Sequence, residues 1–150
     1  MKNIIKALLV FSSLILITFC SDNSVSNSDE HTDAVGMRIV SSGQTIVSYI
    51  RDDSTHGEIE VDLDELSAAM FVELYDDEED EWFTPDVDHF TLTAEITDTT
   101  IAQFWQHDGE EGSFEFHIIG KKINTTNIVF SVIHDGHADF VSREIEIEVE

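Results

Sequence analysis

The chain has 150 residues and is strongly acidic, since 32 Asp and Glu stand against 7 Lys and Arg and give a formal net charge of −25 at pH 7. Such a surface repels phosphate, which argues against binding to nucleic acids or to anionic lipid surfaces, because both need a basic footprint. The single cysteine, Cys20, excludes an intramolecular disulfide, so the core alone must hold the fold.

The first twenty residues have the pattern of a targeting segment. Lys2 and Lys6 precede an apolar run at 7–19, which stops at Cys20. The run is shorter than the ~20 residues that a membrane-spanning helix needs, and its basic flank is typical of a cleavable signal peptide. Ile17-Thr18-Phe19-Cys20 resembles the lipobox of bacterial lipoproteins, which implies cleavage after residue 19 and acylation of Cys20, including a palmitate-type chain. The alternative is an ordinary secretory signal with an incidental cysteine.

Residues 20–33 are polar and acidic, and we expect them to form a disordered tether behind the lipidated cysteine. Loss of the signal peptide would remove Lys2 and Lys6 and take the formal charge to −27. These features predict a protein of the bacterial cell envelope that is anchored to a membrane by its lipid, at the outer membrane or the cell surface.

Residues 34–150 are long enough for one domain, and their apolar residues alternate instead of recurring at helical spacing. A hairpin loop is expected at 41–44, and the only competing helix is a short one at 64–69. Eight or nine short strands separated by polar turns favour an all-β, antiparallel β-sandwich. The expected strands are 37–39, 46–50, 59–63, 69–75, 90–96, 101–106, 114–119, 127–134 and 143–150.

Three segments in the C-terminal third carry a more specific pattern. Residues 98–102 read DTTIA, residues 119–128 read IGKKINTTNI and residues 145–149 read IEIEV. Together they resemble the bacterial group 2 immunoglobulin-like domain. The resemblance implies an immunoglobulin-like sandwich that binds, spaces or presents, with no shared catalytic residues. Asn124 stands where the family has Gly, and we expect it to adopt the left-handed backbone that this turn requires.

Histidines are concentrated near two repeated tripeptides. His107-Asp108-Gly109 and His134-Asp135-Gly136 lie at strand ends, and His117 lies on the strand between them. An Asp-Gly turn would bring His137 close to His134. Imidazoles and carboxylates together suit zinc, copper or nickel. The alternative is that these are turn histidines satisfied by neighbouring aspartates. The candidate ligands are His107, His117, His134, His137, Asp135 and Asp139.

The acidic run at 76–81 and the aromatic pair that follows it suggest two further sites. Carboxylates could hold calcium, but the run lacks the spacing of an EF-hand loop, and a solvated loop explains it more simply. Trp82 and Phe83 are expected to form an exposed contact surface, unless they cap the edge of the sandwich.

Two hypotheses for function follow. The first is a lipid-anchored envelope protein whose immunoglobulin-like module is non-catalytic, monomeric, and either structural or bound to a protein or glycan partner. The second is an envelope lipoprotein that binds zinc, copper or nickel through its histidine turns. The chain contains no G-x-S-x-G, no phosphate-binding glycine loop and no cysteine besides Cys20, so we expect no enzyme activity.

Overall fold

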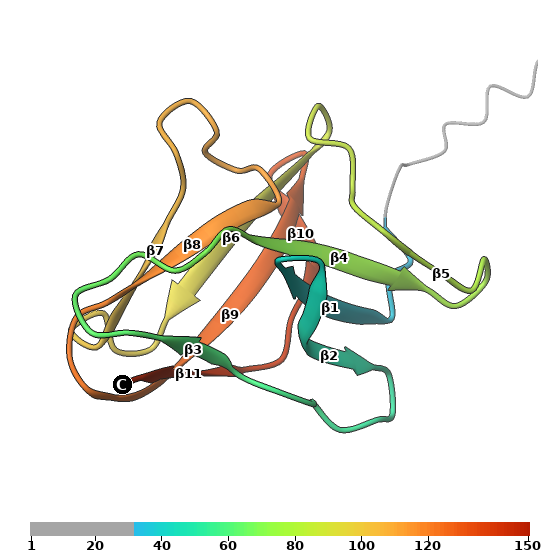
Figure 1. The fold of residues 1–150 in the computed structure, drawn as a ribbon. Helices are drawn as coiled ribbons and strands as arrows, with labels where there is room; N and C mark the ends of the chain where they lie inside the picture. Colours follow the sequence, from blue (N-terminus) through green and yellow to red (C-terminus); the bar gives the residue numbers. More distant parts are fainter. Residues whose placement is uncertain (1–31) are drawn as a thin grey trace, which may run out of the picture.

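A computed structural model describes residues 32–150 (Figure 1). The proposed signal peptide, Cys20 and most of the proposed tether lie outside these residues. Within the described part, no helix has the length and apolar character needed to cross a membrane.

The described residues form an all-β domain with eleven strands (Figure 1). The strands are β1 (Gly36–Ser41), β2 (Gln44–Ile50), β3 (Ile59–Val61), β4 (Met70–Asp76), β5 (Glu81–Phe83), β6 (Phe90–Ile96), β7 (Ala102–Trp105), β8 (Glu115–Gly120), β9 (Asn124–His134), β10 (His137–Val141) and β11 (Ile145–Val149).

Two sheets pack face to face, as the alternating sequence predicted. One sheet has the order β2-β1-β4-β8-β7, with β5 also paired to β4, and the other has the order β10-β9-β11-β3, with β6 also paired to β9. The long strand β9 organises the second sheet. It pairs with β6 along one edge and with β11 and then β10 along the other.

The core lies between the sheets and is filled by the inward-facing residues of both. Phe116 of β8 and Phe130 of β9 are fully buried, and their ring centroids are 5.0 Å apart. Phe104 of β7 packs on both rings. These contacts join the two sheets at the centre of the domain, because β7 and β8 belong to one sheet and β9 to the other.

Several local expectations were wrong. Residues 64–69 form no helix: Asp64 has a φ of 62°, and the segment runs along β8, where the Ser67 amide donates to the Ile118 carbonyl at 2.9 Å. Asn124 has no left-handed backbone, because it begins β9 and pairs with Val149. Tertiary pairing therefore overrides local propensity at both places.

The strand pattern also differs from expectation in two respects. The short strand β5 and the strand β10 were not expected from the alternation. In addition, β3 pairs in parallel with the last strand, β11, so the sandwich is antiparallel everywhere among the described strands except at this edge.

Gly120 is required where β8 passes close to residue 62, because a Cβ there would lie 2.5 Å from the Asp62 carbonyl oxygen.

Candidate metal sites

The β9–β10 turn brings two histidines together, as the sequence predicted. Asp135 and Gly136 have φ angles of 49° and 83°, which fits the two-residue type I′ hairpin that Asp-Gly favours. His134 and His137 pair across this turn, and their ring centroids are 6.1 Å apart.

A β-bulge in β10 adds Asp139 to this pair. The register with β9 shifts between Ala138 and Phe140, so Asp139 is an extra residue in the ladder, and a bulge redirects the side chain that it carries. Asp139 Oδ2 lies 3.4 Å from His134 Nδ1, and Asp139 Oδ1 lies 3.1 Å from His137 Nε2. We refer to His134, His137 and Asp139 as the β9–β10 cluster.

The β9–β10 cluster is a partly enclosed set of metal-binding groups. The Asp139 side chain is 2% exposed, against 14% for His134 and 55% for His137, and the His134 ring packs on Phe90 at 4.8 Å between centroids. A buried carboxylate is costly unless positive charge lies beside it. Either protonated imidazoles or a bound cation would supply that charge.

Asp135 lies outside the cluster. Its side chain is 84% exposed, and its Oδ2 is 3.9 Å from His134 Nε2. Its positive φ angle shows that it shapes the turn. Asp139, and not Asp135, is therefore the carboxylate that the fold places between the two histidines.

His107 and His117 form a separate group, so the six predicted ligands do not share one site. Each offers a ligand atom within 4.8 Å of the other and of Glu115, a residue that the sequence reasoning missed. The available signal was the alternation in β8, which places residues 115 and 117 on the same face. We refer to His107, Glu115 and His117 as the β7–β8 cluster.

Trp82 and Phe83 are half-buried and not exposed as expected. The Trp82 ring lies 5.0 Å from the Tyr75 ring and 4.7 Å from the Arg38 guanidinium carbon, while Phe83 packs against the core. The pair therefore packs on the edge of the sandwich, in agreement with the alternative interpretation, and a contact surface at this pair stays a prediction.

The acidic run at 76–81 forms the tight turn between β4 and β5. The Asp76 carboxylate accepts hydrogen bonds from the amides of Glu78 at 2.8 Å and Glu79 at 3.2 Å, as in an Asx turn. The Tyr75 hydroxyl donates to the Asp80 carboxylate, and this hydrogen bond, with slight desolvation and the nearby acidic charges, raises the pKa of Tyr75. These contacts describe a solvated turn.

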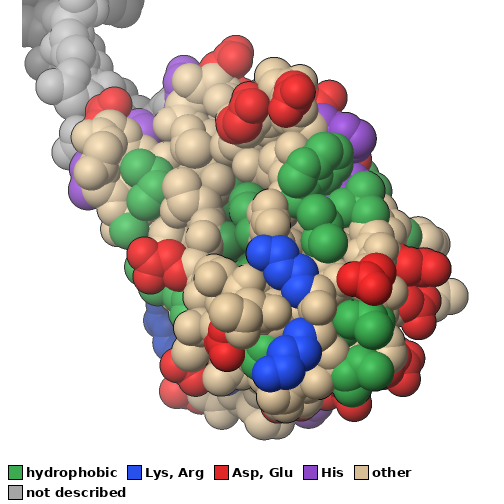
Figure 2. Space-filling view, turned by 90° about the vertical axis from the view of Figure 1, so that its left-hand side faces the viewer, with side chains coloured by type: hydrophobic (Ala, Val, Ile, Leu, Met, Phe, Trp, Pro, Cys, Tyr) green, Lys and Arg blue, Asp and Glu red, His purple; other side chains and the backbone are tan. Residues whose placement is uncertain are grey.

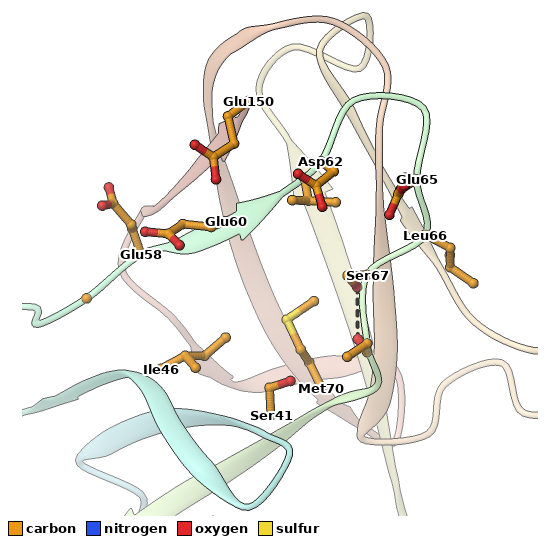
Figure 3. A pocket seen from close by; sticks show the side chains of 13 residues that line it. Ser41, Ile46, Glu58, Glu60, Asp62, Glu65, Leu66, Ser67, Met70 and Glu150 are labelled. Carbon is orange, nitrogen blue, oxygen red and sulfur yellow. Dashed lines mark hydrogen bonds between the residues drawn. The ribbon is translucent and has the colours of Figure 1, made fainter.

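An acidic pocket of ≈ 570 Å³ lies between β3 and the β1–β2 hairpin (Figure 3). Carboxylates come from β3, the residues on either side of it and Glu150, whereas Ser41, Ile46 and Met70 lie across from them. The pKa of Glu58 is raised by a hydrogen bond with Glu146, slight desolvation and the surrounding carboxylates. Among residues 32–150, no Lys, Arg or His lines the pocket, and its carboxylates alone indicate no particular ligand.

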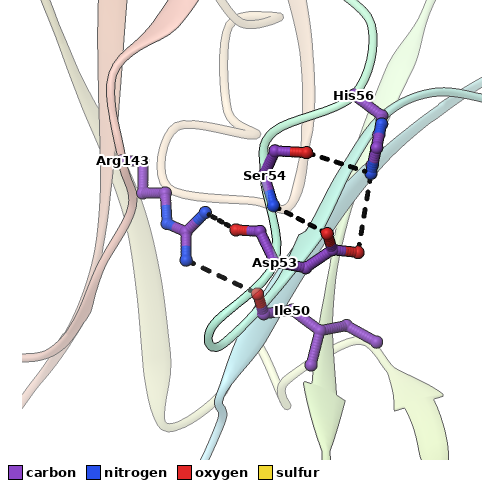
Figure 4. A network of polar contacts seen from close by, with 5 residues as sticks. All are labelled: Ile50, Asp53, Ser54, His56 and Arg143. Atoms are coloured by element: carbon purple, nitrogen blue, oxygen red, sulfur yellow. Dashed lines mark hydrogen bonds and ion pairs between the residues drawn. The ribbon is translucent and has the colours of Figure 1, made fainter.

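A polar network around Arg143 ties the two sheets together (Figure 4). The Arg143 guanidinium donates to the carbonyls of Asp53 and Ile50 and lies 4.5 Å from the Tyr49 ring centroid. The hydrogen bond from the Ser54 amide is the main reason that the pKa of Asp53 is lowered. Every member that the structure describes has a partner within the fold, which indicates a structural role.

Acidic groups outnumber basic groups on the surface. On the face drawn in Figure 2, Asp and Glu side chains are widely distributed, Lys and Arg form only small groups, and histidines lie around the margins of the view. This distribution agrees with the composition, and it would attract cations in general.

Comparisons with known proteins give no family. No family model matches the chain, and no curated protein matches it. The chain is similar to the solved structure of domains 4 and 5 of the S-layer protein SbsC, with a TM-score of 0.44 and 13% identity. The match covers 69% of this chain and 63% of that one, so the chain spans less than two thirds of the length of that structure. The chain is thus identified only by its fold, an all-β domain of two packed sheets.

Proposed function

We propose that this chain is a non-catalytic, lipid-anchored protein of the bacterial cell envelope whose β-sandwich binds a divalent transition metal ion at the β9–β10 cluster. The observation that carries the metal site is the placement of a buried carboxylate between two imidazoles. The anchor rests on Lys2, Lys6, the apolar run at 7–19 and Cys20.

The spacing of the donor atoms supports a metal. Zinc lies about 2.0–2.1 Å from each imidazole or carboxylate ligand in a tetrahedral site, so that neighbouring donors are about 3.3–3.4 Å apart. The two nitrogen–oxygen separations at Asp139, 3.4 and 3.1 Å, are close to this value. One ligand atom from each of the three residues lies within 4.8 Å of the other two.

Charge supports the same proposal. A divalent ion would compensate the buried Asp139 carboxylate without protonation of either imidazole, and the acidic surface would raise the local concentration of cations. Nitrogen and oxygen donors without thiolate favour zinc, copper(II) or nickel over copper(I). The three donors leave coordination positions to water or to a partner's ligand atom.

The test is calorimetric titration of the detergent-solubilised protein with zinc, copper(II) and nickel chlorides. The informative variant is His137→Ala, because this ligand is half-exposed and its removal leaves the core intact. We expect at least one saturable site, whose affinity falls about tenfold or more in the variant, as ligand-shell losses commonly do.

The matched control is His56→Ala, which removes a histidine that is 63% exposed, against 55% for His137, beside a carboxylate, Asp53, outside both clusters. It should bind metal like the parent. Weak attraction to the acidic surface would persist in every variant and be screened by salt. Equal affinity in the parent and in His137→Ala would refute metal binding at the β9–β10 cluster.

A further inference from the structure

We propose that the β7–β8 cluster is a second transition-metal site, independent of the β9–β10 cluster, with His107, Glu115 and His117 as ligands and copper(II) as the tightest-binding divalent ion. The proposal rests on different residues, different strands and a different observation from the proposed function.

The strongest observation concerns His117, whose side chain is fixed in one orientation. The residue is 7% exposed, and its Nδ1 lies 2.9 Å from the carbonyl oxygen of Ser67. A carbonyl only accepts, so Nδ1 carries a proton, and in the neutral imidazole Nε2 then carries the lone pair. Among the described residues Nε2 is buried and has no hydrogen-bond partner.

An imidazole held in this way is prepared for a metal. Metal-binding histidines almost always donate the other ring nitrogen to a carbonyl or carboxylate, which sets the tautomer and the ring orientation. A buried acceptor without a partner costs free energy, and a structural histidine would be expected to have both nitrogens satisfied. An ion bound at Nε2 would remove this cost.

The other two ligands converge on the same place from neighbouring elements. Glu115 lies two residues before His117 on the same face of β8. The His107 ring lies 5.2 Å from the His117 ring at an interplanar angle of 90°. One ligand atom from each of the three residues falls within 4.8 Å of the others.

The loop that carries His107 is rigidly held. The Gln106 side chain donates to the carbonyls of Ser113 and Glu115 at 2.8 and 3.1 Å and accepts from the Gly112 amide at 2.9 Å. Gly112 packs so closely on β6 that a Cβ would lie 2.5 Å from the Thr91 side chain. Little ordering is therefore required when an ion binds, which favours affinity.

The donor set decides the class of ion. Two imidazoles and a carboxylate suit zinc, nickel and copper(II), and among these the Irving–Williams order places copper(II) first. Calcium and magnesium prefer all-oxygen sites, so they should not compete.

Trp105 gives this site its own reporter. Its ring lies 4.6 Å from the His107 ring and 5.4 Å from the His117 ring, and paramagnetic copper(II) at such a distance quenches tryptophan fluorescence. The chain has two tryptophans. In a Trp82→Phe background, Trp105 is the only fluorescent tryptophan, and zinc, which is diamagnetic, should compete with copper without quenching.

The experiment is a copper(II) titration of detergent-solubilised full-length Trp82→Phe protein, at neutral pH and in salt high enough to screen surface charge. We expect saturable quenching that zinc reverses. Adding His107→Ala, which removes an exposed ligand, should weaken the apparent affinity about tenfold or more. Glu115→Gln should weaken it in the same direction, and circular dichroism should show that both variants keep the β-sheet fold.

Two controls separate this proposal from the proposed function. His137→Ala should leave the Trp105 quenching curve unchanged, even if it abolishes binding at the β9–β10 cluster. His56→Ala should also leave the curve unchanged. Absence of saturable quenching, or equal quenching with and without His107, would overturn the β7–β8 site whatever the outcome at the other cluster.

Discussion

The replacement of Phe130 by alanine tests the packing at the centre of the sandwich. The Phe130 ring is fully buried and packs on Phe116 and Phe104 at 5.0 and 6.3 Å between centroids. These rings come from the opposite sheet, so the variant would leave a cavity between the two sheets.

The expected magnitude follows from the area that the ring buries. A buried aromatic side chain removes about 150–250 Å² from water, which at ~25 cal/mol/Å² corresponds to about 4–6 kcal/mol as an upper bound. Alanine retains part of that burial, and measured Phe→Ala losses are about 3–5 kcal/mol. A domain of this size has a free energy of unfolding of roughly 5–15 kcal/mol, so the loss would be a large fraction of the total.

The assay is equilibrium urea unfolding of the detergent-solubilised protein, followed by far-UV circular dichroism. With a denaturant slope of about 1–3 kcal/mol/M, a loss of this size should lower the midpoint by at least ~1 M. Val87→Ala is the matched control, because Val87 is 60% exposed and its loss should change stability by less than about 0.5 kcal/mol. A Phe130→Ala midpoint equal to that of the control would refute the assignment of this ring to the core.

Three further predictions concern the anchor, a buried hydroxyl and a carboxyl pair. Cys20→Ala should move the protein from the detergent phase to the aqueous phase, whereas an aqueous parent would contradict lipidation. Ser142→Ala should cost about 1–3 kcal/mol in urea unfolding, because the Ser142 hydroxyl accepts from the buried Phe130 amide at 2.8 Å; an unchanged midpoint would show that water replaces it. NMR titration should place the pKa of Glu58 above its ordinary value, because of its hydrogen bond with Glu146. Since a raised carboxyl pKa favours the protonated folded state, stability should increase as pH falls through that pKa, and Glu146→Gln should reduce this gain.

The sequence by itself predicted the features that depend on neighbouring residues. Alternation of apolar residues assigned most strands and the two-sheet class, because the two faces of a strand differ every second residue. The Asp-Gly dipeptide at 135–136 predicted the turn that pairs His134 with His137, since this turn type needs positive φ at both positions.

Tertiary structure decided the features that depend on pairing between distant segments. Residues 64–69 have a helix-like composition, but they lie along β8, where Ser67 bonds to Ile118. The parallel pairing of β3 with β11 joins segments that lie far apart in the chain. No local pattern specifies such a partner, because backbone hydrogen-bonding groups are alike in every strand.

In the candidate metal sites, too, the sequence determined the residue types and the tertiary structure determined their positions. The sequence supplied the histidines, but it did not show that they separate into two clusters. The bulge in β10 places the Asp139 carboxylate, and not that of Asp135, between His134 and His137. The register of β7 with β8 brings His117 beside Trp105, near Glu115 and His107. A metal site requires donor atoms within a few ångströms of one another, and only the registers and bulges of the folded sheets determine those distances.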